Sequence, residues 1–273
     1  MFSPGVEKTR LTSAWGTLQL IFHVAVRNVR KSNGNAVLGL FMTMLQSVIM
    51  VAIFYFMFTI LGLKGNAIRG DFMLYVMSGV FMFTTHTKAI GAVSGAEGPT
   101  SPMMQHAPMN PIVSISGAAL SSLYQQILSA AVILLFYHTL FAPITIHQPV
   151  GVLAMMLLSW FSGVGIGMIF LSAKPWQPEA VGVLSTIFQR ANMIASGKMF
   201  VANAATPRIR GWFDWNPLFH TIDQGRGFMF LNYEPRYTSI EYPIYVALVC
   251  MMIGLMGEFY TRKYASLSWG AKH

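Results

Sequence analysis

Three ionisable side chains at three-residue spacing stand out in the segment GWFDWNPLFHTIDQGRGFMF, Gly211 to Phe230. On a helix, His220, Asp223 and Arg226 would share one side, as an acid–base group, a metal site or an ordinary Asp223–Arg226 helix pair. Arginine is not a metal ligand, and no second histidine nearby has a ligand spacing. The chain also lacks a GxSxG motif and an activated cysteine. We therefore predict no catalytic residue, no metal ligand and no enzyme activity. Instead, we interpret the segment as a polar hinge with an interfacial aromatic collar.

Nucleotide-binding chemistry is also missing from the sequence. A Walker A loop requires GxxxxGK[ST], and the nearest approach, SGKMF at Ser196 to Phe200, lacks the leading glycine and the hydroxyl residue. If the protein moves a substrate with ATP, another chain must hydrolyse it. We expect no cofactor in this chain.

The composition is that of a membrane protein. Hydrophobic residues make up 54% of the chain and charged residues 10%, whereas soluble domains are roughly 25% charged. The segment 36–61 carries no charge, and about 20 apolar residues suffice to cross a bilayer. The sequence therefore predicts a polytopic membrane protein, with no cleavable signal peptide.

The charge balance narrows the classes of partner, and the cysteine content narrows the kinds of site. The net charge is +9, but the basic residues flank apolar segments and form no RNA-binding or helix-turn-helix pattern. Anionic lipid headgroups or an acidic substrate are therefore expected partners, and nucleic acid is not. The single cysteine, Cys250, excludes intrachain disulfides and cysteine-cluster zinc sites.

The elements that must position these residues are helices. Apolar stretches predict about six transmembrane helices in an all-α membrane protein: 36–61, 72–94, 112–141, 151–172, 180–200 and 243–258. The longest polar segment, 201–241, separates the last two. This six-span permease domain is assigned to 35–273.

The N-terminal region, 1–34, is predicted to be a cytoplasmic N-terminus with an amphipathic interfacial helix. Its apolar residues recur at helical spacing: Trp15, Leu18, Phe22, Ala25 and Val29. The alternative is a soluble helix packed on a partner protein.

Several residues within the predicted spans have a specific expected role. Gly163 and Gly167 have the GxxxG spacing that permits close helix approach. Arg190 either faces a cavity, because an ionisable side chain is costly in lipid, or extends to the interface. His86 and Lys88 are expected at the interface, since a polar loop follows them.

The positive-inside rule sets the expected orientation. With the termini inside, the inner segments carry a modest excess of Lys and Arg. The basic residues before the first span, which usually dominates, are Lys8, Arg10, Arg27, Arg30 and Lys31. We expect both termini in the cytoplasm.

Taken with the basic N-terminal helix and the Pro-rich loop after the second span, one stretch resembles a known family. SGKMFVANAATPRIRGWFDWNPLFHTIDQGRGFMF combines a small-residue span end, a Pro-containing turn, an NPL.H motif (Asn216, Pro217, Leu218 and His220) and a later Arg226. This pattern is similar to that of type-2 ABC exporter permeases. The closing GEFYTRKY looks like the end of their capsular-polysaccharide branch.

The resemblance implies two specialised segments. The outer segment 201–241 would form re-entrant helices between spans five and six. The segment 100–110 would present a short coupling helix to an ATPase subunit; an unremarkable loop is the alternative. Thr100 or Ser101 could cap it and Pro102 suits its first turn. The ATPase-coupling residues are Thr100, Ser101, Pro102, Met103, Met104, Gln105, His106 and Asn110.

The function that the resemblance implies is that of one half of a homodimeric pore in the bacterial inner membrane. Two ATPase subunits would bind ATP and Mg, and envelope-spanning export proteins are further candidate partners. The passenger would be a lipid-linked, acidic capsular polysaccharide. The expected substrate-path residues are Arg190, Arg208, Arg210, Trp212, Trp215, Phe219, His220 and Arg226. The alternatives are another lipid-linked glycan such as O-antigen or teichoic acid, a drug, a secondary transporter, or a membrane enzyme or scaffold.

Overall fold

The computed structural model describes residues 10–31, 36–60, 62, 68, 70–98 and 110–264. Within these residues the chain is helical and no strand is present, so the all-α prediction is confirmed. The elements are α1 (Arg10–Lys31), α2 (Ala36–Ile60), α3 (Phe72–Ser94), α5 (Pro111–Leu140), α6 (Pro149–Ala173), α7 (Pro178–Ala195), the 3₁₀ helix η1 (Ala202–Ala204), α8 (Pro207–Arg210), α9 (Pro217–Met229) and α10 (Glu241–Tyr264).

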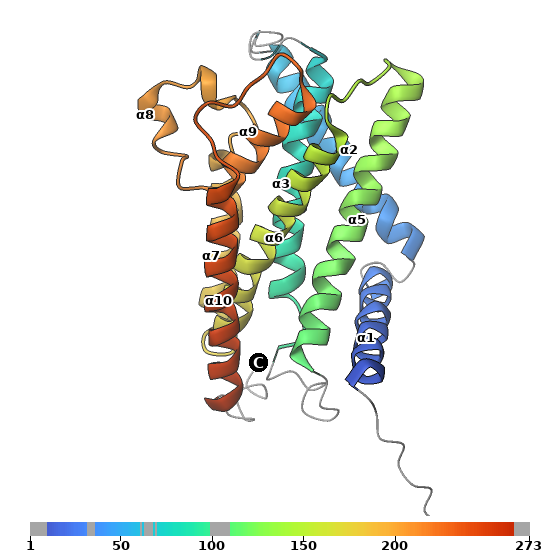
Figure 1. Ribbon diagram of the computed structural model, residues 1–273, viewed down its shortest axis with the longest axis vertical. Helices are drawn as coiled ribbons and strands as arrows, with labels where there is room; N and C mark the ends of the chain where they lie inside the picture. Colours follow the sequence, from blue (N-terminus) through green and yellow to red (C-terminus); the bar gives the residue numbers. More distant parts are fainter. Residues whose placement is uncertain are drawn as a thin grey trace, which may run out of the picture.

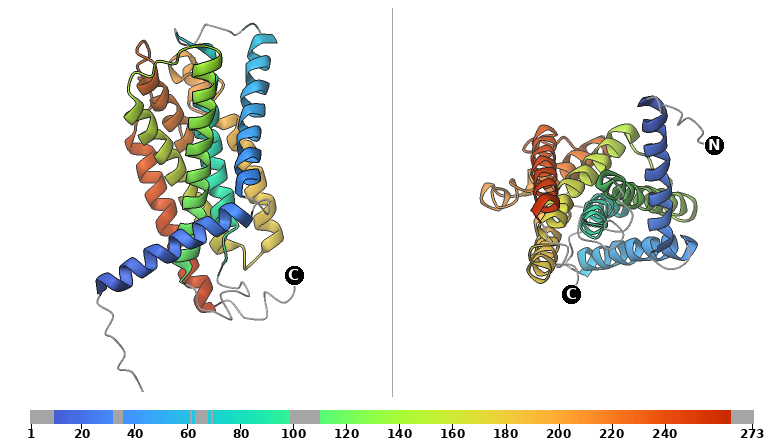
Figure 2. Two further views of the ribbon diagram at one scale, coloured as in Figure 1. Left: turned by 90° about the vertical axis from the view of Figure 1, so that its right-hand side faces the viewer. Right: turned by 90° about the horizontal axis from the view of Figure 1, so that it is seen from below.

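The long helices run side by side along one axis, and α1 lies across one end of the bundle (Figures 1 and 2). We call this end the α1 end and the opposite end, where α8 and α9 lie, the α9 end. The chain runs alternately between the two ends through α2, α3, α5, α6, α7 and α10. The last turn of α10 therefore returns to the α1 end.

Four of the six predicted spans are confirmed as helices long and apolar enough to cross a membrane. Their membrane-crossing segments are Val37–Ile60, Pro111–Leu140, Pro149–Ala173 and Glu241–Tyr264. The predicted second and fifth spans are the helices α3 and α7, but neither reaches the same hydropathy within the described residues. Polar residues explain this, since α3 contains His86 and Lys88 and α7 contains Glu179 and Arg190.

Helix starts follow the local sequence. Asp71 caps α3 by accepting hydrogen bonds from the backbone N–H groups of Met73 (2.8 Å) and Leu74 (3.5 Å). Its other carboxylate oxygen accepts a hydrogen bond from Tyr137 Oη at 2.7 Å. Asp71 therefore both starts α3 and ties it to the last turn of α5. Several other helices begin with proline in the first turn, where its missing N–H costs nothing.

The centre of the bundle is the packing of α3 against α6. Gly163 and Gly167 allow the two helices to approach closely, as their GxxxG spacing predicted. A Cβ atom at Gly163 would lie 2.5 Å from the carbonyl oxygen of His86, and one at Gly167 would lie 2.9 Å from Cβ of Val93. This contact encloses most of α3, which is how a helix with polar residues can occupy the middle of an apolar bundle.

Replacing Gly163 by leucine is expected to destabilise the bundle, because the side chain would collide with the α3 backbone. Overpacking of this kind costs about 1–3 kcal/mol or more. The thermal unfolding midpoint of the purified protein in detergent should fall. Gly182→Leu on α7 is the matched control, because a Cβ there meets nothing within 4 Å. Equal midpoints for the two variants would contradict the importance of this contact.

Helix α1 has an exposed and a buried part. Trp15, Leu18 and Phe22 are 66%, 58% and 65% exposed, whereas Val24 and Val29 are buried. Val24 packs on α5, where a Cβ atom at Gly117 would lie only 2.5 Å from its Cγ1. Apolar side chains exposed on a basic helix across the bundle end are the geometry expected of an interfacial helix.

Candidate functional site

The NPL.H motif begins α9 and joins it to α7. Asn216 caps α9, because its Oδ1 accepts a hydrogen bond from the backbone N–H of Leu218 at 3.0 Å. Its Nδ2 donates to Asn192 Oδ1 at 2.6 Å and to the carbonyl oxygen of Ala195 at 2.9 Å. One side chain thereby fixes the start of α9 to the last turn of α7.

Arg226 holds the chain segment that follows α7. Its guanidinium is fully buried. Nη1 donates to the carbonyl oxygens of Gly197 (3.2 Å) and Phe200 (2.7 Å), and Nη2 donates to that of Lys198 (2.6 Å). The guanidinium carbon also lies 4.2 Å from the centre of the Tyr75 ring on α3. Hydrogen bonds from a charged donor are stronger than neutral ones, so this segment is firmly held.

Asp223 holds the same segment through the backbone N–H group of Ala202. Oδ1 accepts hydrogen bonds from the backbone N–H of Ala202 (3.1 Å) and from Tyr233 Oη (2.5 Å), and Oδ2 accepts one from Thr238 Oγ1 (2.9 Å). Burial and the nearby carboxylate raise the pKa of Tyr233, so its hydroxyl keeps its proton.

The structure therefore corrects the interpretation of Asp223 and Arg226 as an ordinary helix pair. Each binds the backbone of 197–202 instead, because that segment passes beside this face of α9. We call Asp223, Arg226 and the segment 197–202 the α9 clamp.

His220 is held by backbone groups. Its Nε2 lies 2.9 Å from the carbonyl oxygen of Asp214, and its Nδ1 accepts a hydrogen bond from the N–H of Ser239 at 3.1 Å. This arrangement fits a neutral ring with its proton on Nε2. With both nitrogens occupied, the side chain fixes the turns before and after α9.

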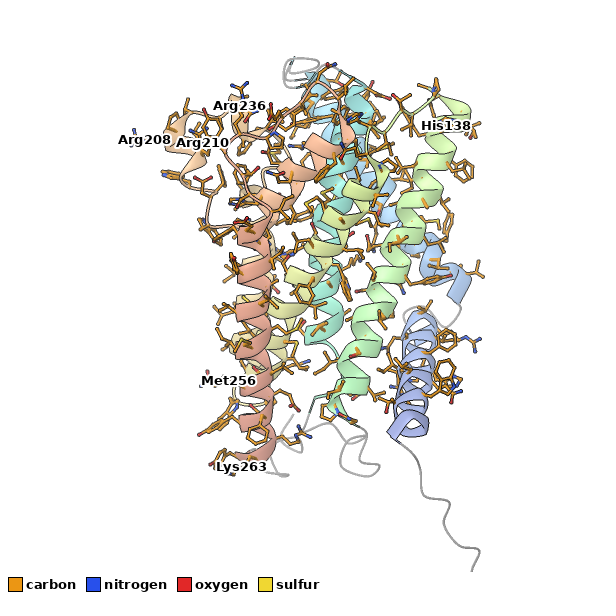
Figure 3. All side chains as sticks on the ribbon, viewed as in Figure 1. His138, Arg208, Arg210, Arg236, Met256 and Lys263 are labelled. Atoms are coloured by element: carbon orange, nitrogen blue, oxygen red, sulfur yellow. The ribbon has the colours of Figure 1, made fainter. Side chains whose placement is uncertain are left out.

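The predicted substrate-path residues fall into two groups. Phe219, His220 and Arg226 are 1%, 7% and 0% exposed and are enclosed by the protein. The others are accessible: Arg190, Arg208, Trp212 and Trp215 are exposed, and Arg210 is half-buried. Arg208 and Arg210 project from α8 at the α9 end (Figure 3).

The predicted coupling residues cannot be placed in the same way. Thr100, Ser101, Pro102, Met103, Met104, Gln105 and His106 lie outside the described residues. Asn110 is described; it is exposed and caps α5 by accepting the N–H of Ile112 at 3.0 Å. The last turn of α3 and the first turn of α5 both lie at the α1 end.

A cavity that the sequence did not predict opens near the α1 end. It has a volume of about 620 Å³ and lies between α1, α2, α3, α5 and α7. Its polar and charged lining residues are Arg27, Asn28, Thr43, Gln46, Thr87, Lys88, Glu97, Ser114, Ser121, Ser122, Gln125 and Gln189. We call it the polar cavity.

Among its described lining residues, the polar cavity carries more positive than negative charge, with two bases, Arg27 and Lys88, and one acid, Glu97. Lys88 Nζ donates to Gln46 Oε1 at 2.7 Å. Polar side chains inside predicted spans are functional candidates by default. Thr43 and Gln46 on α2 recur three residues apart, and Ser121 and Ser122 on α5 lie four and three residues before Gln125. This spacing is the sequence signal that could have revealed the cavity.

The expectation for His86 is wrong. It is not interfacial but fully buried, with Nδ1 3.0 Å from both the carbonyl oxygen of Ser159 and Oγ of Ser162. The close approach of α6 at Gly163 brings these acceptors within reach. Lys88, two residues later, is exposed and lines the polar cavity.

Comparison with known proteins gives two relatives. No model of a known family matches the chain. Two Escherichia coli proteins, each named polysialic acid transport protein KpsM, are 25% and 24% identical to it over 206 residues. The alignment covers 72% of this chain and 76% of each relative. Both matches confirm the resemblance to the capsular-polysaccharide branch of ABC exporter permeases and the expectation of a transport subunit rather than an enzyme.

Proposed function

We propose that this chain is the permease subunit of an ATP-driven exporter that moves lipid-linked capsular polysaccharide across the bacterial inner membrane. The observation that carries the proposal is the polar cavity, which places Arg27 and Lys88 among apolar helices next to an interfacial helix. A basic, hydrogen-bonding cavity next to the interfacial helix suits the anionic headgroup of a glycolipid. The similarity to two proteins named for transport of an acidic polysaccharide supports this cargo.

The proposed membrane arrangement has six crossings. In addition to the four apolar helices, α3 crosses at the centre of the bundle and α7 crosses at its edge. Six crossings agree with the positions of α1 and the last turn of α10 at one end, which we assign to the cytoplasm. Helix α9 would be re-entrant, because Leu218 and Ile222 pack on Met82, Phe83 and Met155 inside the bundle.

The proposed assembly contains a second copy of this chain and two ATPase subunits, which would hold ATP and Mg. Exposed apolar side chains on α7, such as Val183, Leu184 and Ile187, would face lipid or the second copy. The segment 100–110, which follows α3 in the sequence, would contact the ATPase. Envelope-spanning export proteins would bind at the opposite, α9 end.

The proposed path starts at the polar cavity and ends at the α9 end. Arg190, Arg208, Arg210, Trp212 and Trp215 are accessible and would contact the passenger. The buried residues of the same prediction, Phe219, His220 and Arg226, would instead position the outer segment, because protein encloses them.

Purification of the tagged chain in a gentle detergent tests this function. We expect an ATPase to co-purify and to be lost when Met103 and Met104 are both replaced by aspartate. The control adds the same charges at the opposite end, by Thr145→Asp and His147→Asp on an exposed loop, and should retain the ATPase. A chain that purifies alone while active in the membrane would favour a secondary transporter or an enzyme.

A further inference from the structure

A second cavity lies at the surface of the α9 end, apart from the polar cavity. It has a volume of about 430 Å³, within the range of roughly 300–1,000 Å³ typical of small-ligand sites. Its lining combines residues of η1 with the loop that follows α9: Asn203, Leu231, Asn232, Tyr233, Glu234, Arg236 and Tyr237. We call it the outer pocket.

The outer pocket is held together by hydrogen bonds before any ligand binds. Asn203 Nδ2 donates to the carbonyl oxygen of Glu234 at 2.7 Å, and Asn203 Oδ1 accepts the N–H of Arg236 at 3.2 Å. Tyr233 is anchored below by its hydroxyl, which donates to Asp223 of the α9 clamp. A pocket with a fixed backbone loses little conformational freedom on binding.

Basic side chains gather around this pocket. Arg236 lines it, and the guanidinium carbon of Arg210 lies 3.3 Å from the centre of the Tyr237 ring, which also lines it. Figure 3 shows Arg208, Arg210 and Arg236 at the α8 side of the bundle. Glu234 is the one acid among the described lining residues. Arginine binds carboxylates with two parallel hydrogen bonds, so this setting favours a ligand with carboxylate groups.

The remaining lining suits a sugar ring. The amides of Asn232 and the exposed surface of Tyr237, which is 52% exposed, can meet ring hydroxyls and an apolar sugar face. The lining thus offers amides, aromatic rings and the guanidinium group of Arg236 together. On the basis of the proposed function, we propose that the outer pocket binds a carboxylated sugar residue of the polysaccharide as it leaves the permease.

Binding of a sialic acid tetramer to the purified, full-length chain tests this proposal. Saturation-transfer NMR should detect the tetramer bound to the unsubstituted protein but not maltotetraose, a neutral oligosaccharide of equal length. Arg236→Gln, which removes a charged hydrogen-bond donor, and Tyr237→Ala, which removes the ring surface, are each expected to weaken binding by about tenfold. Lys263→Gln, at the opposite end of α10 (Figure 3), should bind normally.

Three results would overturn the proposal: no binding of the tetramer, equal binding of maltotetraose, or full binding by Arg236→Gln. Complete displacement of the tetramer by equimolar inorganic phosphate would also overturn it, since the site would then recognise any anion. Co-purification of the ATPase, measured on the same preparations, reports separately on the exporter function. An ATPase that co-purifies with a chain unable to bind the tetramer would refute the outer pocket alone.

Discussion

Arg226→Met is expected to lower the free energy of unfolding by about 3–5 kcal/mol, the usual cost of breaking a buried, hydrogen-bonded charge. The substitution leaves the carbonyl oxygens of Gly197, Lys198 and Phe200 without their donors. Thermal unfolding followed by tryptophan fluorescence in detergent should show the loss, together with a lower yield of folded protein.

Lys198→Met is the matched control, because it removes a second buried cation in the same place. Lys198 is 3% exposed, and among the described residues its Nζ has no hydrogen-bond partner. The ammonium lies over the rings of Phe83 (3.4 Å) and Phe54 (4.7 Å). Methionine fills this space without a buried charge, and the backbone carbonyl of residue 198 still accepts from Arg226. We expect unchanged or increased stability, and equal losses in the two variants would show that the clamp contributes nothing specific.

Lys88→Glu is expected to reduce export at least tenfold while leaving the amount of protein and the ATPase association unchanged. The substitution changes the polar cavity from one excess positive charge to one excess negative charge, counted over Arg27, Lys88 and Glu97. Like charges placed together at a binding site cost several kcal/mol, which is enough to exclude an anionic headgroup. The measurement is the amount of polysaccharide on the cell surface per permease in the membrane.

Lys174→Glu controls for the charge change itself. Lys174 is exposed at the C-terminus of α6, at the same end of the bundle, but does not line the polar cavity. This variant should export normally. Normal export by Lys88→Glu would remove the polar cavity from the proposed path.

The fold was predictable where a single segment determines the outcome. The helix over 72–94 was predicted to the residue, because Asp71 caps its start and Gly95 follows its end. Helix α2 and the close approach at α6 were predictable for the same reason. The charge-free run and the GxxxG spacing each lie within one short segment. Hydropathy separates α3 from the four apolar helices, because its polar residues lower the mean hydropathy although packing shields most of them.

The candidate sites were less predictable, because they combine distant segments. The spacing of Asp223 and Arg226 correctly placed them on one helix face, but it could not reveal that 197–202 lies against that face. The polar cavity combines residues from five helices, and no single helix shows from its own sequence that the others lie beside it. The burial of His86 likewise depends on Ser159 and Ser162, more than 70 positions away.

The attachment of α7 has a mechanical consequence. Of its residues, only Asn192 and Ala195, in the last two turns, are buried. At that end Asn216 and the α9 clamp hold it, and at the other end Trp176 Nε1 donates to Thr261 Oγ1 of α10 at 2.8 Å. Because α7 is held at both ends and lightly packed between them, its middle is the part that bends most easily. Bending of α7 would therefore move Gln189, which lines the polar cavity, without releasing either end.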